Sequence, residues 1–261
     1  MDSGISGPFT LRAQCCLLSL LLLHSPLLLA ESPAAGETQE ITGSVASLLP
    51  EQAEDLSKVL PGDRQVRWKL YVPRNDSPSG VLVFVSPGTS GDLQPGWARI
   101  LEQRNLIWIA AEDYGNPAPV SQRILVALMG LTFVQRNHTV DTKRIYIGGM
   151  SGGGRVASAV ITKFPRLFTG AVYIVGANFW TPEEAGSIKD IAANRYVFLT
   201  GENDFNRQDT RNVLRKYRNA GVEQTLLIDL PRFGHEYPNA HQLARALEFL
   251  DTGVTPGEAS R

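Results

Sequence analysis

The sequence predicts an α/β domain in which a mostly parallel central sheet is covered by helices on both faces. Short β-rich runs alternate with segments of helical spacing across residues 66–250, a pattern typical of βαβ crossovers. Several of the runs are apolar throughout, as strands buried on both faces are. The 261 residues are 43% hydrophobic, and neither an internal repeat nor a linker divides them. One sizeable core is therefore expected.

The expected elements follow from their periodicity. Residues 66–72 (VRWKLYV) alternate, whereas 81–85 (VLVFV) and 106–111 (LIWIAA) are continuous apolar strands. Residues 121–137 carry apolar side chains at helical spacing. The later predicted strands are 143–149, 170–176, 195–201 and 225–230, and the later predicted helices are 153–163, 207–221 and 239–250. A loop-rich stretch, RNDSPSG, separates 66–72 from 81–85, so we expect these two to form an antiparallel hairpin at the sheet edge.

The first 30 residues have the composition of a secretory signal peptide. A short apolar run ends in small residues and is followed by the polar ESPAAGETQE, which favours cleavage and a secreted or periplasmic location. The alternative, an uncleaved anchor, is disfavoured because His24 and Pro26 interrupt a run shorter than the ~20 apolar residues of a spanning helix. Both cysteines, Cys15 and Cys16, lie in this segment. We expect a signal peptide at 1–30, a flexible leader at 31–60, the catalytic domain at 61–261, and no stable membrane anchor after cleavage.

The charges do not indicate a polyanionic partner. The chain has 25 basic and 26 acidic residues, a net charge of −1, and no basic stripe, so nucleic acid is not an expected partner. No His, Cys and Asp cluster has the spacing of metal ligands, and neither a metal nor a cofactor is expected. The sequence does not indicate an oligomeric state.

Ser151 lies in the pentamer GMSGG, which satisfies the pattern G-x-S-x-G. The predicted strand 143–149 precedes it and the predicted helix 153–163 follows, which is the order that a nucleophile turn requires. The surrounding glycines leave room for a strained turn and for close approach of neighbouring backbone. The alternative, a phosphate cradle, is disfavoured because GGMSGGGR lacks the Lys-Ser/Thr ending of a P-loop.

A serine hydroxyl needs a base, and the base needs a third group that fixes its tautomer. His235 follows a glycine in the loop between the last predicted strand and helix, whereas His138 ends a helix and His241 begins one. Of the mature histidines, His235 alone is thus expected at the carboxyl edge of the sheet, where such sites lie. A loop histidine with no role is the alternative, disfavoured because His235 arrives in register with the other two groups.

For the acid, Asp204 in GENDF follows the strand 195–201. Its competitors are Glu202, close to the strand end, and Asp209, where a carboxylate stabilises the start of a helix. The chain order is then Ser151, Asp204, His235, the serine, acid, histidine order of α/β-hydrolases.

An oxyanion needs preorganised N–H donors. We expect one at Gly152, directly after the serine, and a second in the loop FVSPGTSGD, at Thr89 with Gly88 as the nearest competitor.

The motifs GGMSGGG, GENDF and FGHEYP, in this order and each after its own strand, resemble those of the α/β-hydrolase superfamily. The resemblance covers about residues 66–250, and the plan without a large cap domain is similar to secreted esterases of the polyhydroxybutyrate depolymerase and feruloyl esterase type. It implies an α/β-hydrolase fold and cleavage of small or polymeric carboxylic esters. Such esterases usually carry His-Gly in the oxyanion loop, where this chain has Pro87-Gly88.

Two further loops supply candidate pocket residues. Asn178, Phe179 and Trp180 follow the strand after the nucleophile, and either line the substrate pocket or, for the two aromatic rings, pack under the helices. Tyr114, with Glu112 and Asp113, ends another strand at the same edge and either contacts substrate or is ordinary loop polarity.

The predicted activity is ester hydrolysis through an acyl-enzyme intermediate. Two alternatives remain open: a serine peptidase or amidase on the same fold, and a catalytically silent binding protein of hydrolase fold.

Overall fold

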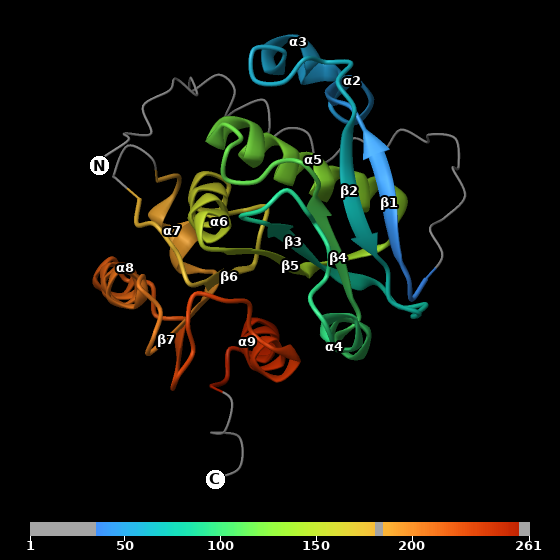
Figure 1. The fold of residues 1–261 in the computed structure, drawn as a ribbon. Helices are drawn as coiled ribbons and strands as arrows, with labels where there is room; N and C mark the ends of the chain where they lie inside the picture. Colours follow the sequence, from blue (N-terminus) through green and yellow to red (C-terminus); the bar gives the residue numbers. More distant parts are fainter. Residues whose placement is uncertain (1–34, 181–184, 256–261) are drawn as a thin grey trace.

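A computed structural model describes residues 35–180 and 185–255 of the chain (Figure 1). The predicted signal peptide and the start of the predicted leader lie outside these residues. Within the described ranges, no helix has both the length and the apolar character needed to cross a bilayer.

The described residues form an eight-stranded sheet with the order β1-β2-β4-β3-β5-β6-β7-β8. Its strands are β1 (Thr38–Gly43), β2 (Val66–Tyr71), β3 (Ser79–Val85), β4 (Leu106–Ala111), β5 (Val140–Met150), β6 (Gly170–Ile174), β7 (Arg195–Gly201) and β8 (Thr225–Leu230). The pairings from β4 through β8 are parallel, whereas β1 and β2 are antiparallel to their neighbours. The predicted parallel sheet is confirmed.

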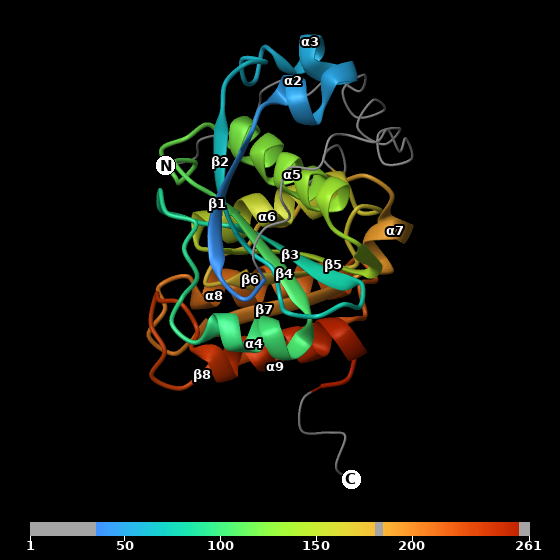
Figure 2. The ribbon, with the colours of Figure 1, turned by 90° about the vertical axis from the view of Figure 1, so that its right-hand side faces the viewer.

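Helices cover both faces of this sheet, as predicted. They are α2 (Val45–Leu48), the 3₁₀ turn η2 (Pro50–Gln52), α3 (Ala53–Leu56), α4 (Trp97–Arg104), α5 (Val120–Asn137), α6 (Gly152–Lys163), α7 (Ile188–Ala192), α8 (Arg207–Asn219) and α9 (Ala240–Thr252). Figure 2 shows α5 and α6 on one side of the sheet and α4 and α9 on the other.

The side chains of β3 show why both faces are apolar. Val81, Val83 and Val85 belong to the core that includes α5, α6 and α8, whereas Leu82 and Phe84 belong to the core that includes α4 and α9. Alternate residues of a strand point to opposite faces, so a strand covered on both sides is apolar at every position.

The prediction that residues 66–72 and 81–85 form a hairpin is wrong, because these two strands do not pair with each other. β2 is antiparallel, as expected, but it pairs with β1 and β4, for example Trp68 with Ala111. Both edges of β3 are occupied by β4 and β5, so the loop after β2 carries the chain past β4.

The predicted flexible leader at 31–60 is also wrong where the structure describes it. β1 adds an edge strand to β2, and Ser44 caps α2 with a capping box. Leucines 48, 49, 56 and 60 are buried in the same core as α5. This small apolar set gains its burial from α5, far along the chain, so the folded domain includes residues that the composition assigned to a leader.

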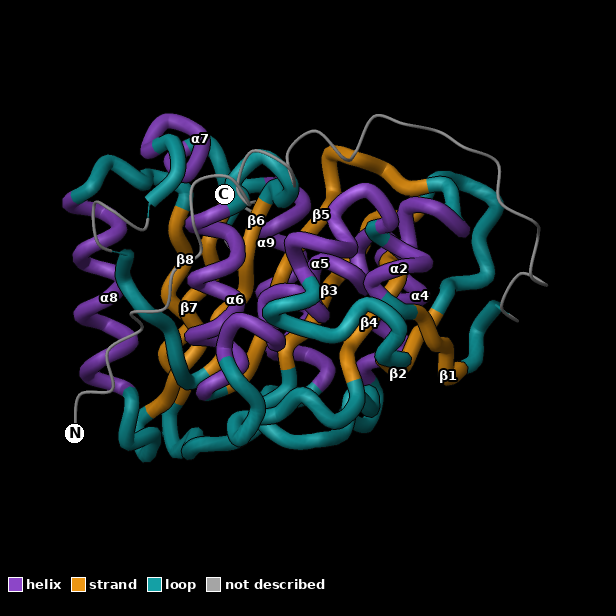
Figure 3. The backbone as a smooth tube through the Cα atoms, turned by 90° about the horizontal axis from the view of Figure 1, so that it is seen from above, coloured by secondary structure: helices purple, strands orange, loops and turns teal. Residues whose placement is uncertain are grey.

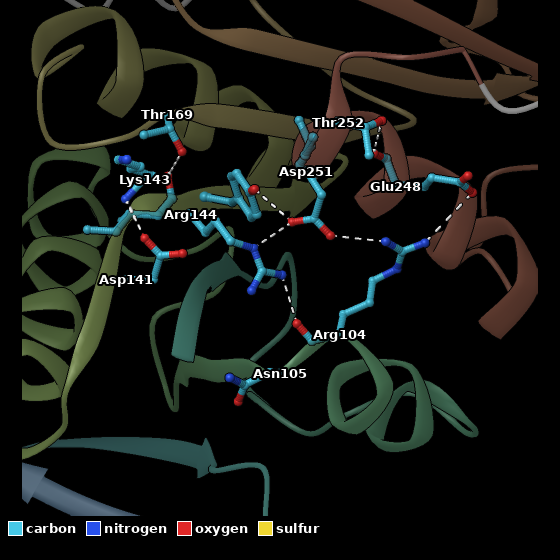
Figure 4. A network of polar contacts seen from close by, with 12 residues as sticks. Arg104, Asn105, Asp141, Lys143, Arg144, Thr169, Glu248, Asp251 and Thr252 are labelled. Carbon is cyan, nitrogen blue, oxygen red and sulfur yellow. Dashed lines mark hydrogen bonds and ion pairs between the residues drawn. The ribbon is translucent and has the colours of Figure 1, made fainter. Parts of the chain in front are cut away.

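Asp251, near the end of α9, links α9 to β5 and α4 at the edge of the sheet opposite to the predicted site (Figure 4). Its carboxylate accepts hydrogen bonds from Arg144 Nε at 2.9 Å, Tyr146 Oη at 2.8 Å and Arg104 Nη1 at 3.0 Å. Burial, with the Asp251 charge beside the phenol, raises the pKa of Tyr146.

We expect Asp251→Ala to lower the free energy of unfolding by about 2 to 3 kcal/mol, because partly buried donors, two of them charged, lose their acceptor. Urea unfolding measures this change. Asp63→Ala, which removes an exposed loop carboxylate, is the matched control and should leave the midpoint unchanged. Equal stability of the two variants would contradict this role for Asp251.

Candidate active site

Ser151 occupies a sharp turn between β5 and α6. Its backbone has φ 53° and ψ −120°, a strained conformation for any residue with a side chain. The Ser151 amide donates to the Ile174 carbonyl at 2.8 Å, and the Ser151 carbonyl accepts from the Arg155 amide at 3.1 Å. The predicted order of strand, turn and helix is confirmed.

The glycines around Ser151 allow close backbone contact. A Cβ at Gly153 would lie 2.8 Å from the Val85 carbonyl carbon and closer still to its oxygen. A Cβ at Gly176 would lie 2.9 Å from the Ser151 Cα. Hence α6 begins directly against the end of β3, and the nucleophile turn lies directly against the end of β6.

The structure brings Ser151, His235 and Asp204 into one hydrogen-bonded chain. His235 Nε2 lies 2.8 Å from Ser151 Oγ, and His235 Nδ1 lies 2.9 Å from Asp204 Oδ1. A carboxylate only accepts, so Nδ1 carries the ring proton and donates it to Asp204. Nε2 is then the acceptor for the serine hydroxyl, which is the arrangement that a general base requires.

Asp204 is held rigidly for this contact. Its side chain is fully buried, with 0% exposed, and it also accepts from Thr200 Oγ1 at 2.7 Å and from the Asn206 amide at 3.0 Å. The two competing carboxylates have other partners: Glu202 accepts from the Arg232 amide, and Asp209 pairs with Arg155. Of the three candidates, Asp204 is the one that contacts His235.

The loop that carries His235 is anchored by an aromatic cluster from α4 and the sheet. Trp97 Nε1 donates to the Pro238 carbonyl at 2.9 Å, and the Trp97 and Tyr237 rings meet edge to face with centroids 6.0 Å apart. Trp97 also meets Trp108 of β4 edge to face at 5.5 Å. Helix α4, which the sequence reasoning missed, therefore helps to fix the position of His235. The helical spacing of the apolar residues Trp97, Ile100 and Leu101 is the sequence pattern that indicates this helix.

Phe205 is a second residue that the sequence reasoning missed. Its ring stacks on the His235 imidazole with centroids 4.1 Å apart and planes at 23°. Its exposed fraction is 77%, which is unusual for a phenyl ring. One face of the ring thus covers the histidine while the remainder is exposed to solvent.

The two predicted oxyanion donors come from α6 and from the loop after β3. Gly152 is the first residue of α6, so its amide has no acceptor within the helix. In the β3 loop, the Gly88 amide donates to Ser86 Oγ at 3.2 Å, whereas the Thr89 carbonyl accepts from the Asp113 amide at 2.7 Å. No hydrogen bond between described residues uses the Thr89 amide, which favours Thr89 over Gly88 as the donor.

A buried arginine supports this loop from behind. Arg123 of α5 donates from Nη2 to the Ser86 carbonyl at 2.9 Å and from Nε to the Tyr114 carbonyl at 3.1 Å. Burial lowers the pKa of Arg123 to about 10, and within residues 35–180 and 185–255 no carboxylate pairs with it. Arg123 therefore joins the β3 and β4 loops through their carbonyl groups.

The candidate pocket residues have different surroundings. Trp180 is buried, stacks on Phe179 with centroids 4.3 Å apart, and meets Tyr217 of α8 edge to face at 4.5 Å. These contacts favour the second alternative for Trp180, in which its ring packs in the core beneath α8. Asn178 is partly exposed, and its amide donates to Ser158 Oγ of α6 at 3.0 Å.

In the β4 loop, Tyr114 is partly buried and lines a pocket. Its two acidic neighbours already have partners. Glu112 accepts from the Gly91 amide, and Asp113 pairs with Arg67.

The triad residues and the candidate oxyanion and pocket residues all follow the carboxyl ends of strands in the chain. In Figure 3, the loops drawn in teal gather along the lower edge of the sheet, where α6 and α8 begin. Active sites of open α/β sheets lie at this edge.

Comparison with known proteins supports the fold. The profile of the prolyl oligopeptidase family matches residues 127–230, a range that includes Ser151 and Asp204 and ends before His235. No curated protein matches the sequence.

Three solved structures are similar. The S-formylglutathione hydrolase of Staphylococcus aureus has a TM-score of 0.57 at 15% identity over 85% of this chain and 99% of that chain. EstE1, a thermophilic carboxylesterase cloned from a metagenomic library, has a TM-score of 0.59 at 15% identity over 94% and 95%. A ferulic acid esterase has a TM-score of 0.58 at 15% identity over 82% and 97%.

At this identity the likenesses concern the fold. Together with the strand order and the turn at Ser151, they show which fold the chain has. The chain has the α/β-hydrolase fold, without a large cap domain among its described residues, and the resemblance seen in the three sequence motifs is confirmed.

Proposed function

We propose that this protein is an exported serine hydrolase that cleaves carboxylic esters through an acyl-enzyme intermediate. The observation that carries the proposal is the hydrogen-bonded chain from Ser151 through His235 to the buried Asp204. A base at 2.8 Å from a hydroxyl on a strained, partly exposed turn is the geometry of an activated nucleophile.

In the proposed reaction, Ser151 Oγ forms a bond to the acyl carbon while its proton passes to His235 Nε2. The negative charge that develops on the carbonyl oxygen is stabilised by the amides of Gly152 and Thr89. The alkoxide leaves with the proton from His235, and a water molecule, deprotonated by the same nitrogen, then releases the acid. Asp204 holds the ring in its tautomer and stabilises the imidazolium.

The N-terminal composition supports the proposal of export, because residues 1–30 have the apolar run and small-residue boundary of a cleaved signal. N-terminal sequencing of the protein recovered from periplasmic and culture fractions tests this. A mature start near Ala30 to Gly36 is expected, and an intact Met1 in the membrane fraction would contradict it.

A second candidate activity is peptide hydrolysis, favoured by the match to the prolyl oligopeptidase profile. The triad chemistry alone does not separate esters from amides. A panel of p-nitrophenyl esters from acetyl to octanoyl, a feruloyl ester, a polyhydroxyalkanoate and peptide p-nitroanilides separates them. We expect turnover of esters to exceed that of anilides; the reverse would favour the peptidase, and no turnover would favour a silent binding protein.

Phe205→Ala should lower kcat/KM for aryl esters by about 2- to 10-fold, since an aromatic stack is worth about 0.5 to 1.5 kcal/mol. The ring covers one face of the His235 imidazole, the group that must give the leaving group its proton. Phe205→Tyr keeps the stack and should retain wild-type values. Steady-state kinetics of the two variants measure this difference, and equal losses in both would assign the effect to something other than the stacked ring.

A further inference from the structure

A pocket of about 290 Å³ lies at the same sheet edge as Ser151, beside the end of β4. Its walls come from β1, the residues before and within β2, the loop after β4, and the first turn of α5. The residues that matter for its chemistry are Arg64, Arg67, Thr42, Asp113, Tyr114 and Gln122. At this volume the pocket holds only part of a typical ligand.

The pocket carries an excess of positive charge. Arg67 is neutralised by Asp113 at 2.8 Å and Glu40 at 3.2 Å. Arg64 is exposed, and its guanidinium has no hydrogen bond or ion pair with any described residue. The N-terminus of α5 adds a partial positive charge to the pocket. Its first turn has no acidic residue, and no side chain caps it at Pro119. One unpaired guanidinium, beside an ion pair between Arg67 and Asp113 and neutral polar groups, suits a single negative charge, and its planar fork suits a carboxylate.

A short strap, residues 113–116, connects this pocket to the nucleophile turn. Asp113 has φ 66°, and its amide donates to the Thr89 carbonyl at 2.7 Å. The Asn116 amide donates to the Pro87 carbonyl at 2.8 Å, so the strap lies along the oxyanion loop. The Asn116 side chain lies against Gly152, since a Cβ there would be 2.8 Å from Asn116 Cγ. Asn116 is two positions after Tyr114, so the two Cα atoms are at most about 7 Å apart.

The strand order gives the pocket a direction relative to the scissile bond. β5 carries Ser151, the pocket lies toward β4, β2 and β1, and Asp204 and His235 follow β7 and β8 on the other side. The leaving oxygen must face His235 Nε2 to receive its proton. The acyl group is therefore the part of the ester that extends toward the pocket.

We infer that this pocket binds a carboxylate at the far end of the acyl group, so that the substrates are esters of dicarboxylic or similarly anionic acids. The inference rests on the proposed ester hydrolysis. It assigns Arg64 as the residue that pairs with the carboxylate and Tyr114 as the wall along which the acyl chain lies.

Matched esters test this inference. We would compare 4-nitrophenyl monoesters of the dicarboxylic acids from adipate to sebacate with the analogues in which the terminal carboxylate is a carboxamide. At the best length, wild type should prefer the carboxylate by about 10- to 100-fold in kcat/KM, mainly through KM, as expected of a charge-assisted bidentate pair. Arg64→Gln should reduce this ratio to near unity, and Arg64→Lys should restore part of it.

Arg99→Gln, which removes an exposed arginine of α4 on the opposite face, is the matched control and should keep the wild-type ratio. A wild-type ratio near unity, or a preference that persists in Arg64→Gln, would overturn the inference.

Binding without turnover separates this inference from the proposed function. Free dicarboxylates are titrated calorimetrically into Ser151→Ala and into the double variant with Arg64→Gln. Binding to the first and not the second, without ester hydrolysis by wild type, would support the pocket and remove the proposed function. Ester hydrolysis with no carboxylate preference and no binding would remove the pocket alone.

Discussion

Ester hydrolysis is expected to fall by about 10⁴- to 10⁶-fold in kcat when Ser151 is replaced by alanine, because the nucleophile is lost and only binding and the oxyanion donors remain. Alanine, like serine, has a Cβ, so the backbone strain at φ 53° should be the same in both and the fold should be retained. Steady-state hydrolysis of p-nitrophenyl acetate measures the loss, and thermal unfolding verifies that the variant is folded.

The control for this variant is Ser57→Ala, which removes an exposed hydroxyl at the end of α3 and should leave kcat unaltered. If Ser151→Ala kept activity near the wild-type value, the nucleophile would be a residue other than Ser151.

A paired substitution of adjacent glycines should show the second large effect. In Gly153→Ala the new methyl group meets the backbone of Val85, which no side-chain rotation can relieve. We expect a loss of about 3 kcal/mol or more in unfolding free energy. We also expect a loss of about 10²-fold in kcat, because α6 and the oxyanion loop must move apart.

Gly152→Ala is the matched comparison, since its methyl group meets the Asn116 side chain, which is exposed and free to rotate. Its unfolding free energy should change by less than about 1 kcal/mol. Urea unfolding and kinetics of both variants test the pair. Similar stabilities for the two would show that the close approach of α6 to β3 is not required.

Local signals in the sequence were sufficient for the parts of the site that follow strands. Ser151, Asp204 and His235 each lie in a loop directly after a predicted strand, and a parallel sheet brings such loops to one edge. Their meeting therefore follows from strand order and direction, both of which periodicity indicates. Among Glu202, Asp204 and Asp209, the position relative to the end of the strand predicted Asp204 as the acid. In the structure Asp204 is the carboxylate that contacts His235.

Features that depend on distant segments were not predictable in this way. β1 becomes a strand because β2 offers it an edge, and the leucines around α3 become buried because α5 covers them. The hairpin partner of β2 was wrong because pairing depends on which edges remain open after the whole sheet forms. The stack of Phe205 on His235 and the two carbonyl contacts of Arg123 likewise join loops far apart in sequence.

The surroundings of Trp180 could not be predicted from its neighbours in the sequence. Its position after β6 is shared by residues that line pockets and by residues that pack under helices. Tyr217, on α8, decides between these, because its ring meets Trp180 edge to face in the core.

The central claim is that Ser151 is an activated nucleophile, and covalent labelling with a fluorophosphonate tests it most directly. A serine oxygen displaces fluoride and forms a stable phosphonyl ester only when a base removes its proton. Trypsin releases residues 145–155, a peptide bounded by Arg144 and Arg155 in which Ser151 is the single serine. We predict one adduct per folded molecule, located on this peptide, and none after heat denaturation or in His235→Ala. Absence of an adduct from the folded protein, or an adduct on another peptide, would contradict the assignment of Ser151.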